Sequence, residues 1–208
     1  MVIPKITIID YGIGNVWSVI SAFKYLGANV ELISDPRIIS RSSILVLPGV
    51  GSFKNGMELL TNRRIDEAII DAVINKEAKI LGVCLGMQLL GSHSNEGGET
   101  KGLGLLPNKV EEFSKEEVEN KKIPHVGFNT LLIDKYEGLF KGLPDQPDFY
   151  FTHSHRMLLD DFEGNYAVCN YGVNFLAAYH IGNICGAQFH PEKSQTNGLI
   201  MLKNFIEI

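Results

Sequence analysis

The stretch KILGVCLGMQLL, residues 79–90, combines a strand-like run, a cysteine between two glycines and the start of a helix. Residues 79–83 have the short, mainly apolar character of a buried strand. A nucleophile on a sharp strand-to-helix turn stands above its sheet, and small residues two positions before and after it relieve crowding. The stretch therefore predicts an α/β fold that presents Cys84 at such a turn.

The residues before this stretch alternate between strand-like and helix-like segments. Strands are predicted at 5–10, 29–33, 44–47 and 79–83. One apolar face predicts a helix over 16–26, with Asn15 as its N-cap and Gly27 as its stop. A second helix is predicted around 65–73. This rhythm is typical of a parallel sheet covered by helices.

The second half of the chain is richer in strands. Four strands are predicted at 149–152, 166–171, 175–180 and 183–189, and the turns between them favour antiparallel pairing. A closing helix is predicted near 197–207. The polar region 94–122 is expected to be a loop excursion. With no convincing linker, residues 1–208 are expected to form a single domain.

Composition excludes several classes of function. The 208 residues carry a net charge of −5, and no Lys/Arg run offers a footprint for nucleic acid. No apolar stretch approaches the roughly 18 residues of a membrane span, and no secretory signal is recognised. Three cysteines without metal-like spacing suit a reducing cytoplasm better than a disulfide framework. Cys169 and Cys185 are expected in the core. We expect neither a metal nor a cofactor.

Cys84 needs a base, and the base needs an orienting group. His190 and Glu192 supply both in FHPE, residues 189–192. In extended backbone these two side chains point the same way, so the carboxylate can hold one imidazole nitrogen while the other faces sulfur. The helix after Cys84 favours its thiolate, and the backbone N–H of Leu85 is placed to hold an oxyanion. Alone, either motif is also compatible with a structural cysteine or a surface histidine.

Three motifs occur together in order: PGVG (48–51), GVCLGMQ (82–88) and QFHPEKS (188–194). They resemble the motifs of the class I glutamine amidotransferases. DYGIGN (10–15), PHVGFN (124–129) and YFTHS (150–154) resemble, within that class, the glutaminase subunits of imidazole glycerol phosphate synthase, which belongs to histidine biosynthesis. The resemblance implies a flavodoxin-like α/β fold, a mixed sheet flanked by helices with an additional antiparallel β region.

The resemblance also implies roles for individual residues. Cys84 attacks L-glutamine, His190 transfers protons, and Glu192 orients His190. The backbone near Gly51 opposes Leu85 across the oxyanion. Further residues are implied in holding the glutamine (Gly49, Gln88, His153, Ser154 and His155) and in facing a separate (β/α)8 cyclase subunit that forms a heterodimer and receives the ammonia (Asn15, Tyr150 and Lys193).

Two positions depart from the family pattern. The family commonly has Trp where this chain has Phe128, and Tyr where it has His155. Similar amidotransferase–cyclase pairs pass ammonia to the amidination of surface sugars, so the departures leave that destination open beside histidine biosynthesis.

Other functions compete with the glutaminase. Gly12-Ile13-Gly14 follows a strand, as in dinucleotide-binding proteins, but Trp17 stands where the third glycine belongs, and its indole is expected to block close helix–strand packing. His153 and His155 could chelate a metal with His125 or His190, although no Cys or carboxylate spacing completes a zinc site. A non-catalytic interaction module and a hydrolase of another amide remain further alternatives.

Overall fold

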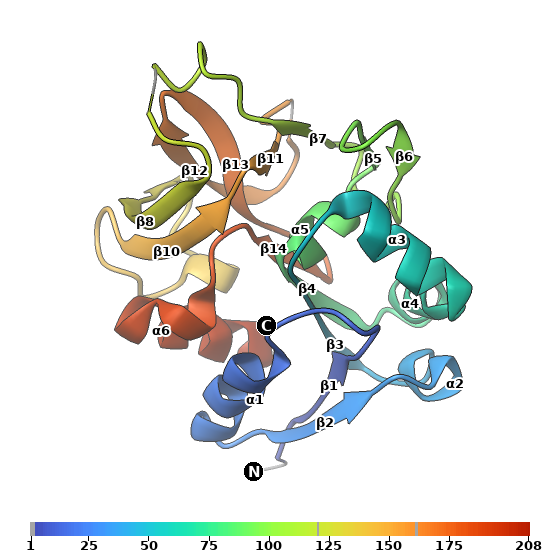
Figure 1. Ribbon diagram of the computed structural model, residues 1–208. Helices are drawn as coiled ribbons and strands as arrows, with labels where there is room; N and C mark the ends of the chain where they lie inside the picture. Colours follow the sequence, from blue (N-terminus) through green and yellow to red (C-terminus); the bar gives the residue numbers. More distant parts are fainter. Residues whose placement is uncertain (1–2, 120, 161) are drawn as a thin grey trace.

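The computed structural model describes residues 3–119, 121–160 and 162–208, and a mixed sheet crosses the molecule between two groups of helices (Figure 1). The strands are β1 (Lys5–Ile9), β2 (Asn29–Ile33), β3 (Ile44–Gly49), β4 (Lys79–Cys84), β5 (His93–Ser94), β6 (Thr100–Lys101), β7 (Lys109–Glu112), β8 (His125–Thr130), β9 (Leu132–Ile133), β10 (Asp148–His153), β11 (His155–Met157), β12 (Asn165–Tyr171), β13 (Val173–Ile181) and β14 (Ile184–Ala187).

The helices are α1 (Val16–Tyr25), α2 (Pro36–Ile39), α3 (Phe53–Asn62), α4 (Ile65–Ile70), α5 (Leu85–Leu89) and α6 (Gln195–Glu207), with a π-helical turn at Asp71–Asn75 and 3-10 turns at Gly138–Phe140 and Pro191–Lys193. The predicted helix over 16–26 is confirmed as α1, and Gly27 follows it with φ +85°. Asn15 occupies the N-cap position, but its side chain caps no backbone N–H and instead donates to Ser18 Oγ.

Four predicted strands form the parallel half of the sheet, in the order β2-β1-β3-β4. Because their carboxyl ends meet at one edge, the turns after β1, β3 and β4 converge there. Alternate β1 side chains enter two apolar cores. Ile8 packs in the core with Phe23 of α1 and Phe205 of α6, whereas Ile9 packs in the core with Leu60 of α3. The predicted helix-covered α/β sheet is confirmed.

The predicted strand at 183–189 was only half right in its pairing. β14 is antiparallel to β13, to which a tight turn joins it, but it is parallel to β4 on its other side. The order β4-β14-β13 therefore joins the parallel half to the antiparallel half. All four residues of β14 are buried, as expected for a central strand. β10 pairs instead with β8 in a separate two-stranded sheet.

The expectation of a loop at 94–122 was wrong in part. β5, β6 and β7 lie in this region and extend the edge of the large sheet. These strands are two to four residues long, too short to leave an alternating pattern in the sequence. The helix α3 was also missed, and the helix expected at 65–73 continues after Ile70 as the π-helical turn.

The expectation that the Trp17 indole blocks close packing between helix and strand was wrong. The Trp17 side chain is 71% exposed on α1 and does not lie between helix and strand. Cys169 and Cys185 are buried, as expected. Among the described residues, no helix has the length and apolar character needed to cross a membrane.

Candidate active site

Cys84 ends β4 and directly precedes α5, and its backbone has φ +55° and ψ −112°. Such a positive φ is rare for a residue other than glycine and marks a strained turn. A Cβ on Gly82 would lie 2.6 Å from the Cα of Met87, and one on Gly86 would lie 1.7 Å from the Leu47 carbonyl oxygen. Both flanking positions therefore require glycine, as the turn predicts.

His190 and Glu192 form the pair expected beside this cysteine. His190 Nδ1 lies 2.8 Å from Glu192 Oε1, and the two side chains are only 4% and 1% exposed. The extended backbone expected here is present at His190, but residues Pro191–Lys193 form a 3-10 turn. Hydrogen bonds from His190 N to the Tyr150 carbonyl and from Ser194 Oγ to the His190 carbonyl fix this turn.

The His190 ring is set up to hold a proton. Burial opposes its charge, but the interactions with Cys84 and Glu192 outweigh burial and raise the pKa of His190 to about 9. Among the described residues, His190 Nε2 has no hydrogen-bond partner, so this nitrogen is available to the Cys84 thiol and to a substrate. A protonated imidazole next to a thiol favours the thiolate, which is the nucleophilic form.

A cavity of about 260 Å³ opens above Cys84. Most of the predicted site residues line it together with two residues that were not predicted, Val50 and Thr152. The predicted residues in the lining are Gly51, Cys84, Leu85, Gln88, His153, Ser154, His155 and His190.

The predicted residue Gly49 does not line the cavity. It ends β3 in register with Cys84, and a Cβ there would lie 2.4 Å from the Tyr11 hydroxyl oxygen. This hydroxyl is buried without a partner among the described residues. Burial, and then the proximity of Cys84, raise the pKa of Tyr11, so the phenol stays neutral. Gly51 has φ +100°, and a Cβ added there would meet nothing within 4 Å.

Two glutamines connect the cavity to the nucleophile. Gln88 Nε2 donates to the His155 carbonyl and to Gln188 Oε1, both at 2.9 Å. Gln188 is fully buried, and its Nε2 lies 3.8 Å from Cys84 Sγ. Since an amide N–H stabilises negative charge on sulfur, Gln188 supports the thiolate. Gln188 belongs to the motif at 188–194, but the sequence alone assigned it no role.

Glu96 is a second residue that sequence reasoning missed. It lies in the region expected to be a polar loop, yet its side chain is only 22% exposed. Its Oε2 accepts the Phe53 backbone N–H at the start of α3, and its Oε1 lies 3.8 Å from His155 Nδ1. Only the tertiary fold brings this carboxylate beside the cavity.

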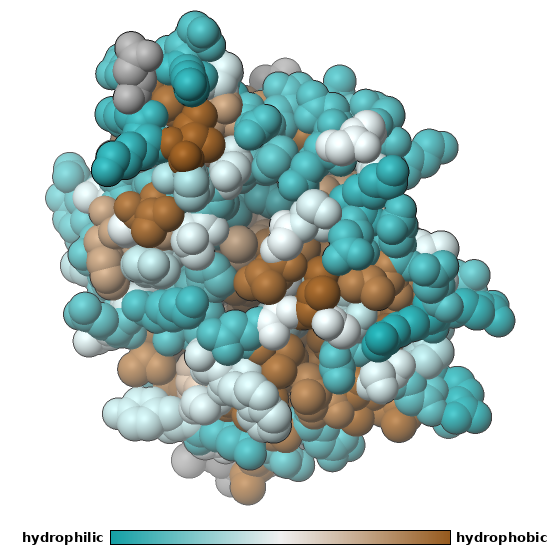
Figure 2. Space-filling model, viewed as in Figure 1, coloured by the Kyte–Doolittle hydropathy of each residue, from teal (hydrophilic) through white to brown (hydrophobic). Residues whose placement is uncertain are grey.

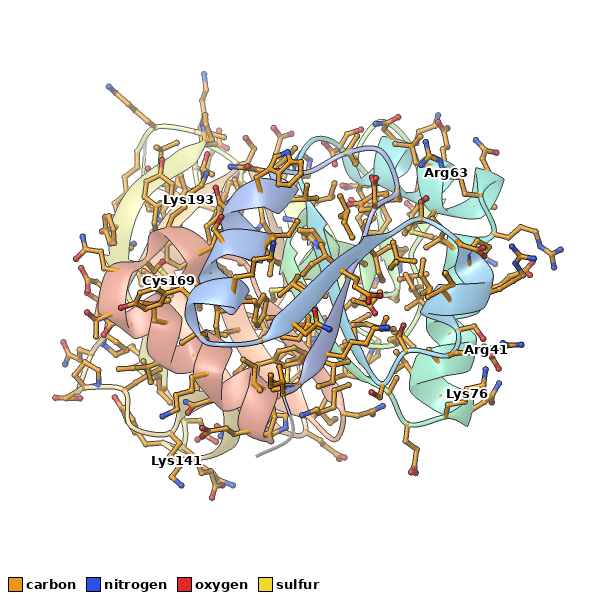
Figure 3. The ribbon with its side chains drawn as sticks, turned by 90° about the horizontal axis from the view of Figure 1, so that it is seen from below. Arg41, Arg63, Lys76, Lys141, Cys169 and Lys193 are labelled. Atoms are coloured by element: carbon orange, nitrogen blue, oxygen red, sulfur yellow. The ribbon has the colours of Figure 1, made fainter. Side chains whose placement is uncertain are left out.

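The residues expected to face a partner lie outside the cavity. Asn15 and Lys193 are exposed, and Lys193 Nζ lies 5.9 Å from the centre of the Tyr150 ring. Phe128 is 48% exposed and packs edge-on against Tyr150. In Figure 3, Lys193 lies on the side of α1 and α6, whereas Arg41 and Lys76 lie at the opposite edge.

This face also carries exposed hydrophobic groups. A groove of about 500 Å³ is lined by Trp17 and Tyr25 of α1, by Leu199 of α6 and by the catalytic candidate Glu192. Hydrophobic side chains come to the surface near the middle of the face shown in Figure 2, between the two groups of helices. Apolar groups gathered beside a site mark a surface that binds another molecule.

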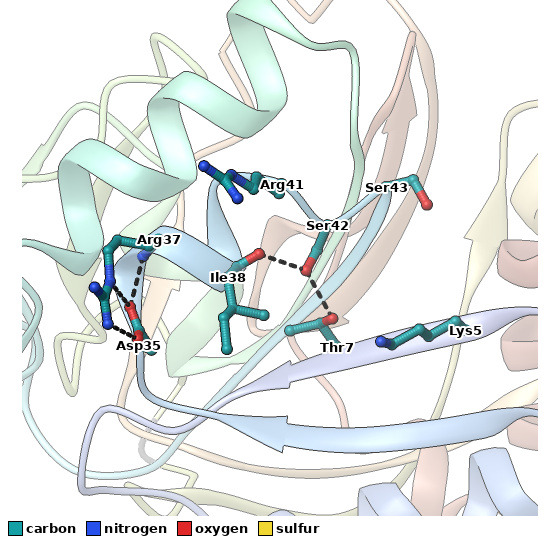
Figure 4. Close-up of a pocket in the computed structure, with 8 residues that line it drawn as sticks. All are labelled: Lys5, Thr7, Asp35, Arg37, Ile38, Arg41, Ser42 and Ser43. Carbon is teal, nitrogen blue, oxygen red and sulfur yellow. Dashed lines mark hydrogen bonds and ion pairs between the residues drawn. The ribbon is translucent and has the colours of Figure 1, made fainter.

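A larger cavity, of about 560 Å³, lies beside β1 and α2. Figure 4 shows that Arg37 is paired with Asp35, and that Ser42 links Thr7 to the Ile38 carbonyl. The lining contains no cysteine or histidine. This cavity therefore offers neither a thiol nucleophile nor an imidazole base.

The metal alternative finds no support in the histidine cluster. Both nitrogens of His153 are engaged, one with His125 and the other with the His155 carbonyl. Within residues 3–119, 121–160 and 162–208, no group of three His, Cys, Asp or Glu side chains is arranged to hold a metal ion.

Solved structures share this fold. A putative GMP synthase protein from Thermoplasma acidophilum superposes with a TM-score of 0.74 at 20% identity, covering 100% of this chain and 94% of the other. PurLQS from Thermotoga maritima superposes with a TM-score of 0.75 at 17% identity, covering 99% of both chains. The expected amidotransferase-like architecture is confirmed.

Sequence comparisons are more specific. Residues 7–208 match the family model for glutamine amidotransferase class-I. The imidazole glycerol phosphate synthase subunit HisH 1 of Parasynechococcus marenigrum (strain WH8102) is 45% identical over 97% of each chain. Subunit HisH of Moorella thermoacetica (strain ATCC 39073 / JCM 9320) is 41% identical over 98% of this chain and 94% of its own. The chain therefore belongs to the class I glutamine amidotransferase family, in the group of the HisH subunits of imidazole glycerol phosphate synthase.

Proposed function

We propose that this chain is the glutaminase subunit of an imidazole glycerol phosphate synthase. It hydrolyses L-glutamine to L-glutamate and ammonia, and a cyclase subunit uses the ammonia to make imidazole glycerol phosphate and AICAR in histidine biosynthesis. The observation that carries the proposal is the presence of Cys84 and His190 in the lining of one cavity, with His190 Nδ1 held by Glu192 Oε1 at 2.8 Å. The HisH relatives, at up to 45% identity over nearly the whole chain, name the enzyme.

The first half of the reaction forms a thioester. The Cys84 thiolate attacks the carboxamide carbon, and the oxygen of the resulting tetrahedral intermediate is held by the backbone N–H of Leu85 and by the backbone near Gly51. His190 gives its proton to the amide nitrogen, which leaves as ammonia. Glu192 orients the ring and stabilises its charged form, since the two groups are 2.8 Å apart and almost fully buried.

The second half regenerates the enzyme. His190, now neutral, takes a proton from water, and the hydroxide adds to the thioester carbon. Collapse of this second intermediate breaks the carbon–sulfur bond, so glutamate leaves and Cys84 returns as a thiolate beside a protonated His190. Cys84, His190, Glu192 and water supply every group that these two half-reactions use.

The cavity also has groups that suit the rest of the substrate. Gln88 uses both amide hydrogens within the protein, so its Oε1 is the acceptor left for the substrate carboxamide. Glu96 lies 3.8 Å from the cavity residue His155 and supplies the negative charge that an α-ammonium group needs. His153, Ser154 and His155 complete the wall that encloses the amino acid.

The ammonia leaves toward the partner face. Ammonia attacks only as the neutral molecule, whereas water at neutral pH holds mainly ammonium, so a shielded route to the cyclase preserves its reactivity. The groove lined by Trp17 lies at the turn that carries Glu192 and Lys193, although the Glu192 side chain itself is only 1% exposed. We infer that a (β/α)8 cyclase subunit binds here as a heterodimer, and we propose that the two subunits act in the cytoplasm.

The proposal is tested by glutamine hydrolysis with purified chain, alone and with a HisF-type cyclase loaded with its nucleotide substrate. We expect weak activity alone, strong stimulation by the loaded partner, and no glutamine-dependent turnover for Cys84→Ala. The cyclase should still use added ammonium in the presence of Cys84→Ala. Normal glutamine hydrolysis by Cys84→Ala would refute the assigned chemistry.

The destination of the ammonia has its own test. The gene is placed in a bacterial strain that lacks its own HisH and therefore needs histidine at low ammonium. Growth without histidine supports the assigned pathway. Failure to restore growth, with glutaminase activity intact and stimulated only by a cyclase from a sugar-modifying gene cluster, would assign the chain to surface-sugar amidination.

A further inference from the structure

Two histidines lie in series behind the glutamine cavity. His125 of β8 and His153 of β10 are opposite each other in the two-stranded sheet. His125 Nδ1 lies 3.0 Å from His153 Nε2, and His153 Nδ1 lies 2.8 Å from the His155 carbonyl oxygen. Both rings are buried, but only His153 lines the cavity. The hydrogen bond of His125 therefore reaches the cavity through His153.

The carbonyl at one end determines where the protons sit. The His155 oxygen only accepts, so His153 Nδ1 carries hydrogen, and in the neutral ring its Nε2 is then an acceptor. His125 Nδ1 must in turn carry hydrogen to donate to it. Burial is the main reason that the pKa of His125 falls to about 4 and that of His153 to about 3, so both rings are neutral near pH 7.

Asn129 fits the other end of this chain. Its Nδ2 lies 3.4 Å from His125 Nε2, the nitrogen left as an acceptor. Two further bonds fix the orientation of the amide independently: Oδ1 accepts the Thr130 N–H, and Nδ2 donates to the Asn170 carbonyl. With hydrogen on Nδ1 of both histidines, Asn129 donates to His125, His125 donates to His153, and His153 donates to the His155 carbonyl. No other placement of the hydrogens on the neutral rings satisfies all three contacts.

The same carbonyl also holds the substrate side of the site. Gln88 Nε2 donates to it at 2.9 Å and donates its second hydrogen to Gln188, which in turn lies beside Cys84. A shift of the His155 carbonyl would release the Gln88 amide and move the acceptor that it presents to the cavity. The position of this carbonyl therefore matters for binding a carboxamide.

We propose that His125 is a positioning residue: acting through His153, it holds the His155 carbonyl and hence the Gln88 amide in the orientation that receives glutamine. This inference rests on the proposed glutaminase function. It assigns His125 to the binding of substrate and not to proton transfer, which stays with His190.

Two substitutions separate hydrogen bonding from packing. His125 stacks on Tyr171 and Phe151, with ring centroids 4.0 Å and 4.7 Å apart. His125→Phe keeps this stack but removes the donor, whereas His125→Asn loses the stack but places an amide N–H where Nδ1 was. In His125→Phe, His153 Nε2 is left as a buried acceptor without a donor, at a cost of about one hydrogen bond. We therefore expect the KM for glutamine to rise about tenfold and kcat to change by less than about threefold.

His125→Asn should keep the KM within about threefold of the unsubstituted chain, even where its thermal stability is lower. The assays use the chain with its cyclase partner, and circular dichroism checks that each variant folds. A KM for His125→Phe nearer to the unsubstituted value than that of His125→Asn would mean that packing is the role, and would overturn the inference. Unchanged KM in both variants would overturn it as well.

A measurement on the unsubstituted chain keeps the inference testable if a variant does not fold. Long-range 15N–1H NMR correlations of labelled histidine distinguish the two neutral tautomers. At pH 7 we expect His125 and His153 both to carry hydrogen on Nδ1, and His153→Gln and His125→Asn assign the signals. A charged ring or an Nε2–H tautomer at either position overturns the inference. Since this measurement needs no turnover, absence of glutaminase activity would count against the proposed function alone.

Discussion

At the scale of single residues, the most consequential feature is the partner that each catalytic group has in this fold. Glu192 Oε1 holds His190 Nδ1, Gln188 approaches the Cys84 sulfur, and no other oxygen or nitrogen of the described residues competes for His190 Nε2. In the proposed mechanism, these contacts orient His190 between Cys84 and Glu192 for proton transfer. The 2.8 Å contact between Glu192 and His190 is short enough that its loss should change the rate measurably.

Substituting Glu192 tests this arrangement through pH. The pKa of His190 is about 9, above its ordinary 6.5, so the proton needed for ammonia release is present below about 9 and lost above it. We expect kcat/KM to fall as pH rises through about 9. Glu192→Gln removes the charge that helps hold the proton and should move this decline to lower pH.

Glu192→Gln should also lower the rate less than His190→Ala, because it leaves the base in place. The contribution of His190 to folding stability also falls as pH rises. A pKa raised on folding stabilises the native state fully below pH 6.5, and this contribution disappears as pH rises through about 9. Rates measured from pH 6 to 10 decide the matter; an alkaline limb that does not move in Glu192→Gln, or equal losses in the two variants, would contradict these roles.

Two tyrosine hydroxyls, one without a hydrogen bond and one with, are expected to contribute differently to stability. Tyr179 is fully buried, and its hydroxyl has no partner among the described residues. Because an unpaired buried hydroxyl is a cost, Tyr179→Phe should leave the free energy of unfolding unchanged or raise it by up to about 1 kcal/mol. In Tyr171→Phe the hydroxyl that donates to the Lys122 carbonyl at 2.7 Å is lost, so stability should fall. Urea unfolding of both variants measures this; a Tyr179→Phe variant less stable than Tyr171→Phe would refute it.

At the scale of elements, the turn between β4 and α5 is the part that sequence reasoning described most fully. The sequence places glycines at 82 and 86, a strand before Cys84 and a helix after it. This pattern predicts a sharp strand-to-helix turn, and the structure has that turn. The neighbouring helix α3 was missed although Phe53, Met57 and Leu60 lie on one face at helical spacing, because Gly56 in its interior lowers its helix propensity. The short strands β5, β6 and β7 were missed because tertiary pairing alone forms them.

The turn provides a prediction at this scale. Gly86→Ala would place a methyl group 1.7 Å from the Leu47 carbonyl oxygen of the adjacent strand, so β3 and α5 must separate. We expect loss of glutaminase activity and a decrease in stability of about 3 kcal/mol or more. Gly97→Ala is the control, since it meets nothing within 4 Å and costs only its positive φ, about 1 kcal/mol. Wild-type-like activity in Gly86→Ala would show that the turn tolerates a side chain.

At the scale of the whole molecule, the exposed aromatic groups around α1 bear on assembly. Trp17 is 71% exposed and lines the groove that reaches Glu192. Trp is enriched among residues that dominate binding energy. Trp17→Ala should therefore weaken binding of the cyclase about tenfold or more while leaving the thermal midpoint unchanged, because little of the side chain packs within the chain.

Calorimetric titration of the cyclase measures this effect. Ile74→Ala is the matched control: Ile74 is 57% exposed in the π-helical turn, away from the groove, and its loss should leave affinity unchanged. Equal affinities for Trp17→Ala and the unsubstituted chain would remove Trp17 from the interface. Equal weakening by Ile74→Ala would place the interface on another face of the molecule.

Local pattern along the chain was enough to predict the parallel strands, the helices α1 and α4, the glycine-flanked Cys84, and the pair His190 and Glu192 only two positions apart. Short-range sterics and periodicity act within a few residues, so they can be read along the chain. The tertiary structure alone decided that β14 lies beside β4, that Glu96 turns toward His155, and that Asn129, His125 and His153 align behind the cavity. Those contacts join residues from separate strands and loops, and the packing of the whole chain, not any local pattern, determines which of them meet.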